Sequence, residues 1–282
     1  LRKGQLMSII EAFIFGLVQG ITEFLPISST AHIIITQMLL GYNFPGLAFE
    51  IYLHIASILA VIIYFRKDIV DVLVGFFSFF TKRTKENKIH FMFGVYIIVA
   101  TLITGVLGIL LKDFIGDAMK TPYFIAGTLA VTGFALIFIE RFHKYGNRTE
   151  KDMTFLDSII VGLGQTLAVL PGISRSGATL IAALLAGLNR DTAVRYSFLL
   201  VIPVILGSSV LAFDELGSGM FSDIGVLALI VSFISTFVFS WLGIVWLIDF
   251  LKRSKLIYFA IYCFIVAILV ALFIDPSTLM DI

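Results

Sequence analysis

Long apolar runs alternate with short charged segments along the chain, and this pattern predicts a bundle of membrane-spanning helices. A helix needs roughly 20 apolar residues to cross the hydrocarbon core of a bilayer. Runs of this kind lie at about residues 48–65, 91–111, 121–140, 194–213, 224–249 and 256–274. We therefore expect six crossings.

Two further apolar regions, at about residues 8–40 and 154–190, are each interrupted near the middle by proline and a polar cluster. Such an interruption is typical of a helical hairpin that enters the bilayer and leaves on the same side, because irregular backbone is tolerated where protein buries it. The predicted fold is an all-α polytopic membrane protein, with six transmembrane helices and two re-entrant helical hairpins in one integral membrane domain.

Composition agrees with this class of fold. Of the 282 residues, 59% are hydrophobic and 14% are charged, which excludes a soluble domain with a polar surface. The net charge of +1 gives no sign of nucleic-acid binding, and the single cysteine, Cys263, excludes a disulfide framework. The first apolar region lacks a small-residue cleavage site and carries Glu11, Gln19 and Glu23, so we expect no cleaved signal peptide.

The charged segments predict an orientation in the membrane. Lys and Arg gather at residues 66–88, 141–151 and 252–255, which should therefore be cytoplasmic. The segments 214–223 and 275–281 carry acidic residues without Lys or Arg and should lie outside. With six crossings the first hairpin then opens to the outside and the second to the inside, so their turns can meet within the membrane.

The two hairpins also resemble each other. An offset of 146 residues aligns glycine, glutamine and serine positions of the first hairpin with the second: Gly16 with Gly162, Gln19 with Gln165, Ser28 with Ser174, and Gly41 with Gly187. Each half, about 8–140 and about 154–274, would hold one hairpin and three crossings, and an odd number of crossings inverts the second half. Inverted repeats place their functional site where the repeats meet.

The first interruption gathers polar side chains. Gln19 and Glu23 share one helix face, and Pro26 ends that helix. A carboxylate at membrane depth needs a cation or a function. The hydroxyls of Ser28, Ser29 and Thr30 and the imidazole of His32 follow directly. Capping of the next helix accounts for Ser28 at least as well as chemistry does, whereas a histidine beside several hydroxyls is placed to act as a base.

The second interruption supplies a cation. Arg175 lies between Ser174 and Ser176, with Gly172 and Gly177 on either side. Glycine lets backbone approach a ligand, and a guanidinium at the start of a helix makes an anion site suited to phosphate.

A simpler alternative is that Arg175 only neutralises Glu23. The whole constellation of acid, base, hydroxyls and guanidinium fits phosphoryl transfer, in which positioning and charge stabilisation dominate. Glu23 and Gln19 are also oxygen ligands of the kind that Mg²⁺ or Ca²⁺ prefers.

Polar residues elsewhere carry weaker signals. Glu50 and His54 lie four apart at the outer end of a crossing, where they either support the cleft or face water. Arg190, Asp191 and Arg195 lie at the cytoplasmic border and most simply anchor the topology.

At these motifs the chain resembles the bacterial undecaprenyl-diphosphate phosphatase family, known also for bacitracin resistance. The resemblance covers nearly the whole chain, and the family's patterns match residues 19–23, 26–32 and 171–177. It implies removal of the terminal phosphate from undecaprenyl diphosphate, which gives the monophosphate lipid carrier for peptidoglycan synthesis. It also implies a divalent cation, Mg²⁺ or Ca²⁺, and a multi-pass protein of the bacterial plasma membrane with its active site facing outside.

The resemblance also implies roles for single residues. Glu23 would be the essential acid and metal ligand, Ser29 the candidate nucleophile, His32 the base or acid, and Arg175 the diphosphate clamp. Five residues would line the substrate pocket: Ser28, Thr30, Ser174, Ser176 and Gly177.

Two positions depart from the family's pattern. Gln19 stands where many relatives carry Glu, which removes a charged metal ligand, and Ala31 stands where many have Gly. Whether Ser29 attacks phosphorus or orients a water stays open.

The expected partners are a polyprenyl diphosphate and membrane lipid, without nucleic acid, and the sequence leaves a homodimer open. A rival interpretation is a secondary transporter or a polyprenyl-phosphate translocase, because inverted repeats with broken helices are also a transport design. A transporter would move its substrate without releasing phosphate.

Overall fold

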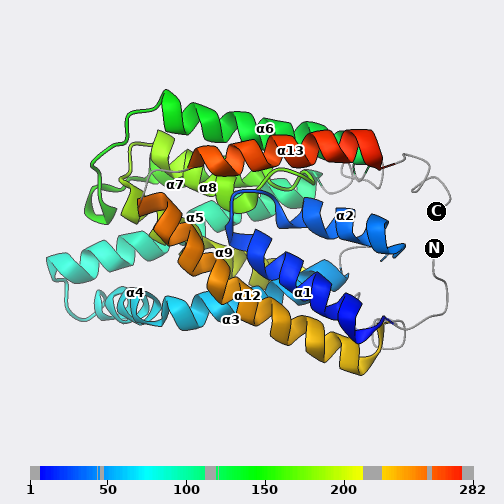
Figure 1. Cartoon of the computed structure of the whole chain (residues 1–282). Helices are drawn as coiled ribbons and strands as arrows, with labels where there is room; N and C mark the ends of the chain where they lie inside the picture. The colour runs from blue at the N-terminus through cyan, green and yellow to red at the C-terminus, as the bar shows by residue number, and fades with distance from the viewer. Residues whose placement is uncertain are drawn as a thin grey trace.

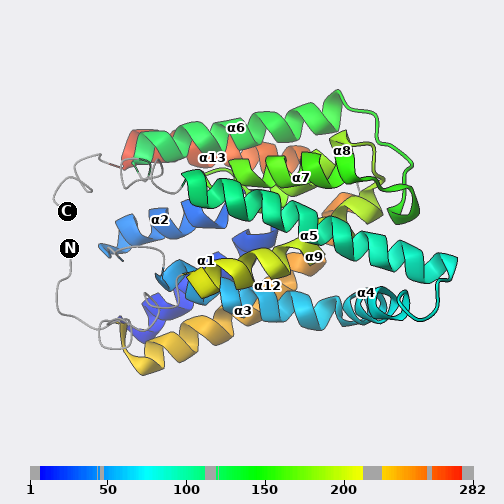
Figure 2. The same cartoon turned by 180° about the vertical axis from the view of Figure 1, so that it is seen from behind.

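The computed structural model describes residues 7–42, 44, 48–111, 119, 121–211, 224–252 and 256–274. Within these residues the secondary structure is helical, apart from one isolated β-bridge between Arg148 and Leu188. The long helices run side by side in one bundle (Figures 1 and 2).

Both interrupted regions form a pair of helices, as the sequence predicts. The pairs are α1 (Ile9–Phe24) with α2 (Ser29–Leu40), and α7 (Phe155–Leu167) with α8 (Arg175–Leu185). Proline has no amide hydrogen and disfavours helical geometry in the residue before it, so Pro26 explains why α1 ends at Phe24. In the second turn Gly172 has φ +94°, which favours glycine.

In each pair, the two helix ends that lie farthest from the turn are joined to each other. Beyond α2, the Tyr42 hydroxyl donates to Glu11 Oε2 in the first turn of α1, at 2.8 Å. Arg148 joins the second pair, donating to Asp157 Oδ2 of α7 at 2.6 Å and to the Ala186 carbonyl beyond α8 at 2.7 Å. The joined ends lie at opposite ends of the bundle (Figure 1), so each pair is a hairpin and the two hairpins point towards each other.

Six longer helices surround the hairpins: α3 (Ala48–Tyr64), α5 (Lys85–Leu111), α6 (Pro122–Arg141), α9 (Arg190–Leu211), α12 (Val226–Lys252) and α13 (Leu256–Phe273). A short 3-10 helix, η3 (Glu150–Asp152), precedes α7. By length and composition, five helices of the described chain could cross a membrane: α5, α6, α9, α12 and α13. The helix α3 joins them only when it is counted together with α4, which follows it. The structure therefore has five to six candidate crossings.

The segment after α3 differs from the prediction. The charge pattern predicts a loop at residues 66–88, whereas Arg66–Ser78 forms the helix α4, bent by 77° from α3. In addition, α5 begins at Lys85 rather than near residue 91. Gly75 of α4 lies directly against His90 of α5, where a Cβ atom would be 2.6 Å from the His90 Cβ. Packing against α5 thus stabilises a helix whose charged ends resemble a loop.

Each hairpin packs closely against one long helix. The helix α1 runs along α12, and α7 runs along α5. A Cβ atom on Gly16 would lie 1.8 Å from Ser235 Oγ of α12, and one on Gly162 would lie 3.1 Å from Ala100 Cα of α5. Glycine is therefore needed at Gly16, and the Gly16–Gly162 pair marks the close approach at both interfaces.

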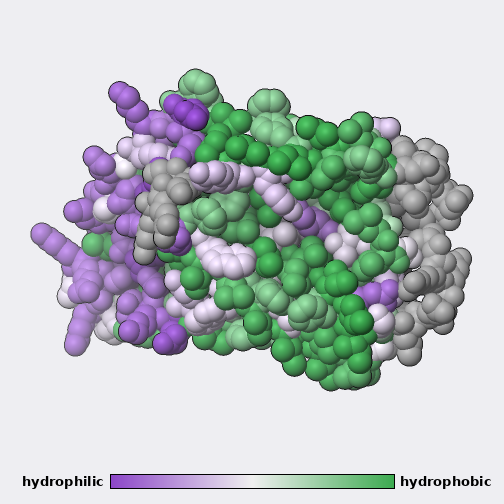
Figure 3. Space-filling view, viewed as in Figure 1, coloured by the Kyte–Doolittle hydropathy of each residue, from purple (hydrophilic) through white to green (hydrophobic). Residues whose placement is uncertain are grey.

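The surface divides by polarity (Figure 3). Apolar residues cover most of the visible length of the bundle, while hydrophilic residues gather at the end that holds α4 and the first turns of α5. Large apolar side chains such as Leu102, Phe134 and Ile268 are more than half exposed, which is typical of a surface in contact with lipid.

Candidate active site

Glu23, in the last turn of α1, is the centre of the polar cluster. Its side chain is only 1% exposed. Two side chains donate to its Oε2 atom, Gln19 Nε2 at 2.8 Å and Ser29 Oγ at 2.7 Å. Arg175 of α8 forms an ion pair with the other oxygen, Oε1. The carboxylate, the hydroxyl and the guanidinium that the sequence predicts for one site do meet.

The ion pair means that Arg175 neutralises Glu23 in this structure, as the simpler alternative states. A guanidinium has five N–H donors, and only one of its nitrogens, Nη2, contacts Glu23. The Arg175 side chain is also 22% exposed. Arg175 can therefore pair with the carboxylate and still present donors to an anion.

The first turn is held in an unusual backbone conformation. Ser28 has φ +67°, a region that non-glycine residues rarely adopt. Its hydroxyl accepts a hydrogen bond from the Ala31 amide at 3.4 Å, so Ser28 caps α2 as one interpretation predicts. This conformation turns the neighbouring Ser29 towards Glu23, whereas Thr30 is half-buried in the first turn of α2.

The second turn is supported by α6 and by the first hairpin. Thr132 of α6 donates to the Gly172 carbonyl at 3.1 Å. Ser174 caps α8, because its hydroxyl accepts a hydrogen bond from the Gly177 amide at 3.1 Å. Ser176 donates to the Leu25 carbonyl at 3.2 Å and so joins the two turns directly. The hydroxyls of Ser174 and Ser176 therefore hold the structure of this turn.

Gly177 lies where the turns touch. A Cβ atom there would be 3.2 Å from Pro26 Cβ and 3.2 Å from Ser174 Oγ. A larger residue would push the hairpins apart, so a structural role accompanies the predicted role in substrate binding.

His32 lies apart from the carboxylate. Its Nδ1 is 2.7 Å from the Ser28 carbonyl oxygen, and its Nε2 is 2.8 Å from the hydroxyl of Tyr262 on α13. A carbonyl oxygen only accepts, so Nδ1 carries the hydrogen, and in the neutral ring Nε2 accepts from Tyr262. The two rings are stacked, with centroids 5.6 Å apart. The structure thus brings Glu23, Ser29 and Arg175 together and directs the hydrogen bonds of His32 elsewhere.

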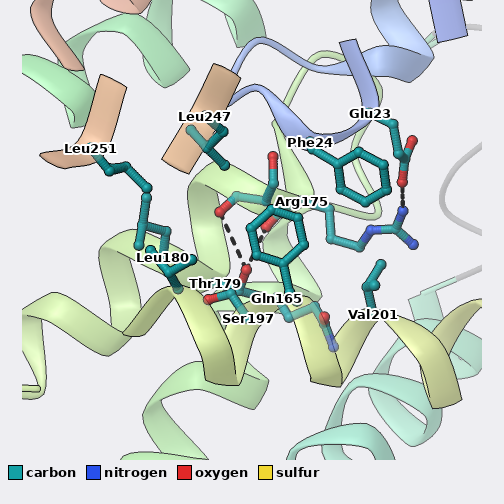
Figure 4. Close-up of a pocket in the computed structure, with 13 residues that line it drawn as sticks. Glu23, Phe24, Gln165, Arg175, Thr179, Leu180, Ser197, Val201, Leu247 and Leu251 are labelled. Carbon is teal, nitrogen blue, oxygen red and sulfur yellow. Dashed lines mark hydrogen bonds and ion pairs between the residues drawn. The ribbon is translucent and has the colours of Figure 1, made fainter. Parts of the chain in front are cut away.

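A pocket adjoins Arg175 (Figure 4). Polar side chains on part of its wall are Glu23, Gln165, Arg175, Ser176, Thr179 and Ser197. Apolar side chains, among them Phe24, Leu180 and Leu247, line the rest. A largely apolar pocket with a few convergent polar groups is typical of a site that binds an amphipathic ligand.

Sequence reasoning gave three of the site's neighbours little or no role. His54 of α3 reaches the cluster, its Nε2 atom 3.1 Å from Glu23 Oε2, while Glu50 instead accepts from Gln37 at 3.0 Å. Gln165 lines the pocket, and its signal was its alignment with Gln19 in the repeat. Tyr262 gave no sign of a functional role in the sequence, because it lies within an apolar run.

The oxygen atoms at Glu23 bear on metal binding. Among the described residues, no three His, Cys, Asp or Glu side chains are grouped to hold a metal ion. Gln19 contacts Glu23 through its Nε2 atom, and its buried Oε1 has no hydrogen-bond partner. Mg²⁺ is usually bound through one or two carboxylates plus substrate phosphates. These residues therefore fit a cation shared with a phosphate ligand, rather than one enclosed by protein alone.

The chain is similar to a known protein family and to curated proteins over nearly its whole length. The sequence model of a family described as bacitracin resistance protein BacA matches residues 12–269. A protein of Halalkalibacterium halodurans, named undecaprenyl-diphosphatase 2, is 69% identical over 277 residues, which cover 98% of this chain and 100% of the relative.

Other relatives are similar over the same length. Undecaprenyl-diphosphatase 1 of Shouchella clausii is 60% identical, over 98% of this chain and 100% of its own. Undecaprenyl-diphosphatase of Oceanobacillus iheyensis is 44% identical, over 95% of this chain and 97% of its own. These matches include both polar turns.

Proposed function

The chain belongs to the bacitracin resistance protein BacA family, and from this premise we propose that it hydrolyses undecaprenyl diphosphate to undecaprenyl phosphate and inorganic phosphate. This reaction would recycle the lipid carrier for peptidoglycan synthesis and confer resistance to bacitracin. The relatives named above are all diphosphatases, so the comparisons favour an enzyme over a transporter or translocase.

One observation carries the proposal: the Ser29 hydroxyl donates to Glu23 while Arg175 contacts the other oxygen of the same carboxylate. A hydroxyl or water bound in this way can lose its proton to the carboxylate as it attacks. The guanidinium would bind the diphosphate and offset the negative charge that develops on the bridging oxygen as its bond to the terminal phosphorus breaks. In this proposal Glu23 is the base, Ser29 is the nucleophile or orients a water that attacks, and Arg175 binds the anion.

The chemistry requires one phosphorus–oxygen bond to break. The attacking oxygen, from Ser29 or from a water that Ser29 orients, bonds to the terminal phosphorus and gives its proton to Glu23. The bond to the bridging oxygen breaks, and the polyprenyl monophosphate leaves with the bonding electron pair. If Ser29 attacks, a water must then cleave the phosphoserine. We assign to His32 Nε2 the role of base towards that water, since in the neutral ring this nitrogen carries no hydrogen and lies beside a hydroxyl. To act as an acid towards the leaving group, His32 would first have to take up a proton.

A divalent cation, Mg²⁺ or Ca²⁺, would be held by Glu23 and Gln19 Oε1 together with the diphosphate. When bound, it would offset the negative charge that accumulates on the phosphate oxygens. Since Gln19 is uncharged, the protein's share of the binding is weaker than with two carboxylates.

We also propose that the fold is an inverted repeat, 8–140 and 154–274, with two re-entrant hairpins, six crossings and an active site that opens outside. Each hairpin packs on a long helix of the other half, α1 on α12 and α7 on α5, and this supports two interlocked repeats. Further support comes from the joined ends of the two hairpins, which lie at opposite ends of the bundle (Figure 1). The diphosphate would reach the polar turns while its lipid tail lies between helices.

The test is phosphate release from a short-chain polyprenyl diphosphate by the full chain purified in detergent. We expect release by the wild type, loss of release with a chelator, recovery with Mg²⁺ or Ca²⁺, and a decrease of at least about 1,000-fold in Arg175→Ala, on the scale of losing a key electrostatic group. Arg141→Ala, a change at an exposed residue at the end of α6, is the matched control and should stay active. Folded wild-type protein that releases no phosphate under any divalent cation would refute the proposal and favour the translocase.

A further inference from the structure

His54 lies outside both polar turns and still reaches the centre of the site. It belongs to α3, which packs against α1, α9 and α12. Its Nε2 atom is 3.1 Å from Glu23 Oε2, and its side chain is 15% exposed, compared with 1% for Glu23. A third helical element thus touches the carboxylate, in addition to the two hairpins.

Three groups converge on the Oε2 atom of Glu23: Gln19 Nε2 at 2.8 Å, Ser29 Oγ at 2.7 Å and His54 Nε2 at 3.1 Å. An ionised carboxylate only accepts hydrogen bonds, so an attractive contact requires a hydrogen on His54 Nε2. The ring therefore acts as a donor in this structure, whichever charge it carries.

Two partners of Glu23 have a second task in the proposed reaction. Arg175 also has to present donors to the diphosphate, and Ser29 must give up its hydroxyl hydrogen or reorient it towards a water. During these steps Glu23 loses the Ser29 contact and shares Arg175 with the substrate. His54 is given no such task in the proposed reaction, so its contact with Glu23 can persist throughout.

We propose that His54 is a positioning residue that holds Glu23 Oε2 towards Ser29 while Arg175 and Ser29 engage the substrate. This inference rests on the proposed phosphatase function and extends it to a residue outside the polar turns. A misplacement of about 1 Å in a catalytic group can cost about 100-fold in rate, so a single well-placed donor can have a large effect on turnover.

The reach of the N–H donor provides the test. Glutamine places its amide nitrogen near the position of histidine Nε2, whereas asparagine is one methylene shorter and methionine has no donor. We would measure kcat and KM for phosphate release by the full chain in detergent, for His54→Gln, His54→Asn and His54→Met. Ser57→Ala is the matched control, because Ser57 is also buried on α3 but contacts Ser240 of α12 at 3.0 Å.

We expect kcat to decrease about 10- to 100-fold in the Asn and Met variants, with KM within about threefold of the wild type. The Gln variant should retain kcat within about fivefold, and Ser57→Ala should match the wild type. Size-exclusion elution and the thermal midpoint establish folding, and if the Met variant does not fold, the two amide variants carry the comparison.

Wild-type kcat in the Asn variant, equal losses in the Gln and Asn variants, or a loss confined to KM would each overturn the role of His54. A wild type that releases no phosphate would instead refute the proposed function, and the inference with it.

Discussion

At the scale of single residues, the site depends on a carboxylate that water barely reaches. A charge removed from water is costly unless it is paired and hydrogen-bonded. Glu23 meets both conditions, through Arg175 on one oxygen and through Gln19, Ser29 and His54 on the other. The same contacts that make burial tolerable also fix the carboxylate in position before substrate arrives, which is how electrostatic catalysis saves reorganisation.

Tyr262 provides a test of how His32 is oriented. The change Tyr262→Phe keeps the ring that stacks on the imidazole and removes the hydroxyl that lies 2.8 Å from Nε2. If His32 transfers a proton, losing this partner should lower kcat about 3- to 30-fold, less than the 100-fold or more that a positioned acid or base can contribute, and should leave KM nearly unchanged. Steady-state phosphate release measures both constants.

The control for this change is Tyr123→Phe, because the Tyr123 side chain is 61% exposed at the start of α6. It should leave both constants unchanged. Equal kcat in Tyr262→Phe and the wild type would mean that the hydroxyl does not take part in orienting His32 for catalysis.

Residues that share a short motif could be predicted to share the site, and those that meet only through helix packing could not. Gln19, Glu23 and Ser29 lie within one hairpin, so helical spacing and Pro26 were enough to group them. His54 and Tyr262 reach their partners because α3 crosses α1 and because α13 lies beside α2. Neither crossing is encoded in local spacing.

At the scale of helices, close approach decides how the hairpins are held. The interface between α1 and α12 has no room for a side chain at Gly16 or Gly20, where a Cβ atom would be 1.8 Å from Ser235 Oγ and 2.6 Å from Phe239 Cβ. Glycine and serine at helix contacts are typical of membrane proteins, because association there relies on close packing rather than on the hydrophobic effect. Glu23 is in α1, so this interface also sets its position.

Gly16→Ala should therefore destabilise the protein. Forcing one methyl group into a filled interface costs about 1–3 kcal/mol, which should lower the thermal midpoint in detergent and reduce activity through displacement of α1. Gly105→Ala is the matched control, because no atom lies within 4 Å of a Cβ at that exposed helical position. Alanine favours helix over glycine by up to about 1 kcal/mol, so this control should be neutral or slightly stabilising. An unchanged midpoint in Gly16→Ala would contradict the close contact.

Helix breaks were easier to predict than helices with charged ends. Proline, glycine and clustered hydroxyls mark both hairpin turns, and the structure confirms both interruptions. The helix α4 was missed because Arg66, Lys67 and the basic residues after Ser78 resemble a solvated loop. Its stability comes from contact with α5, and such tertiary packing overrides local polarity.

At the scale of the whole molecule, polarity is unevenly distributed along the bundle. Hydrophilic residues gather at one end (Figure 3), which agrees with the basic segments that the sequence assigns to the cytoplasm. Arg195 of α9 joins elements at this end, since it pairs with Asp68 of α4 at 2.7 Å and also with Glu150 of η3. Arg195, which the sequence predicts to anchor the topology, thus also joins neighbouring segments.

The proposed orientation can be measured by cysteine labelling of intact cells in a Cys263→Ala background, since Cys263 is buried. Ser218→Cys, in the acidic segment expected outside, should react with a membrane-impermeant maleimide. Lys82→Cys, in the exposed turn after α4, should react only after the cells are permeabilised. The reverse pattern would invert the orientation and place the opening of the site on the cytoplasmic side.

The pairing of Glu23 with Arg175 across 152 residues also has a consequence for biosynthesis. At about 5–20 residues per second, a ribosome needs roughly 8–30 s after making Glu23 before it makes Arg175. During that interval the donors available to the carboxylate are Gln19, which is translated before it, and Ser29 and His54, which are translated soon after it. The first hairpin is therefore synthesised while its counter-charge does not yet exist, and the second half supplies the guanidinium that neutralises its carboxylate.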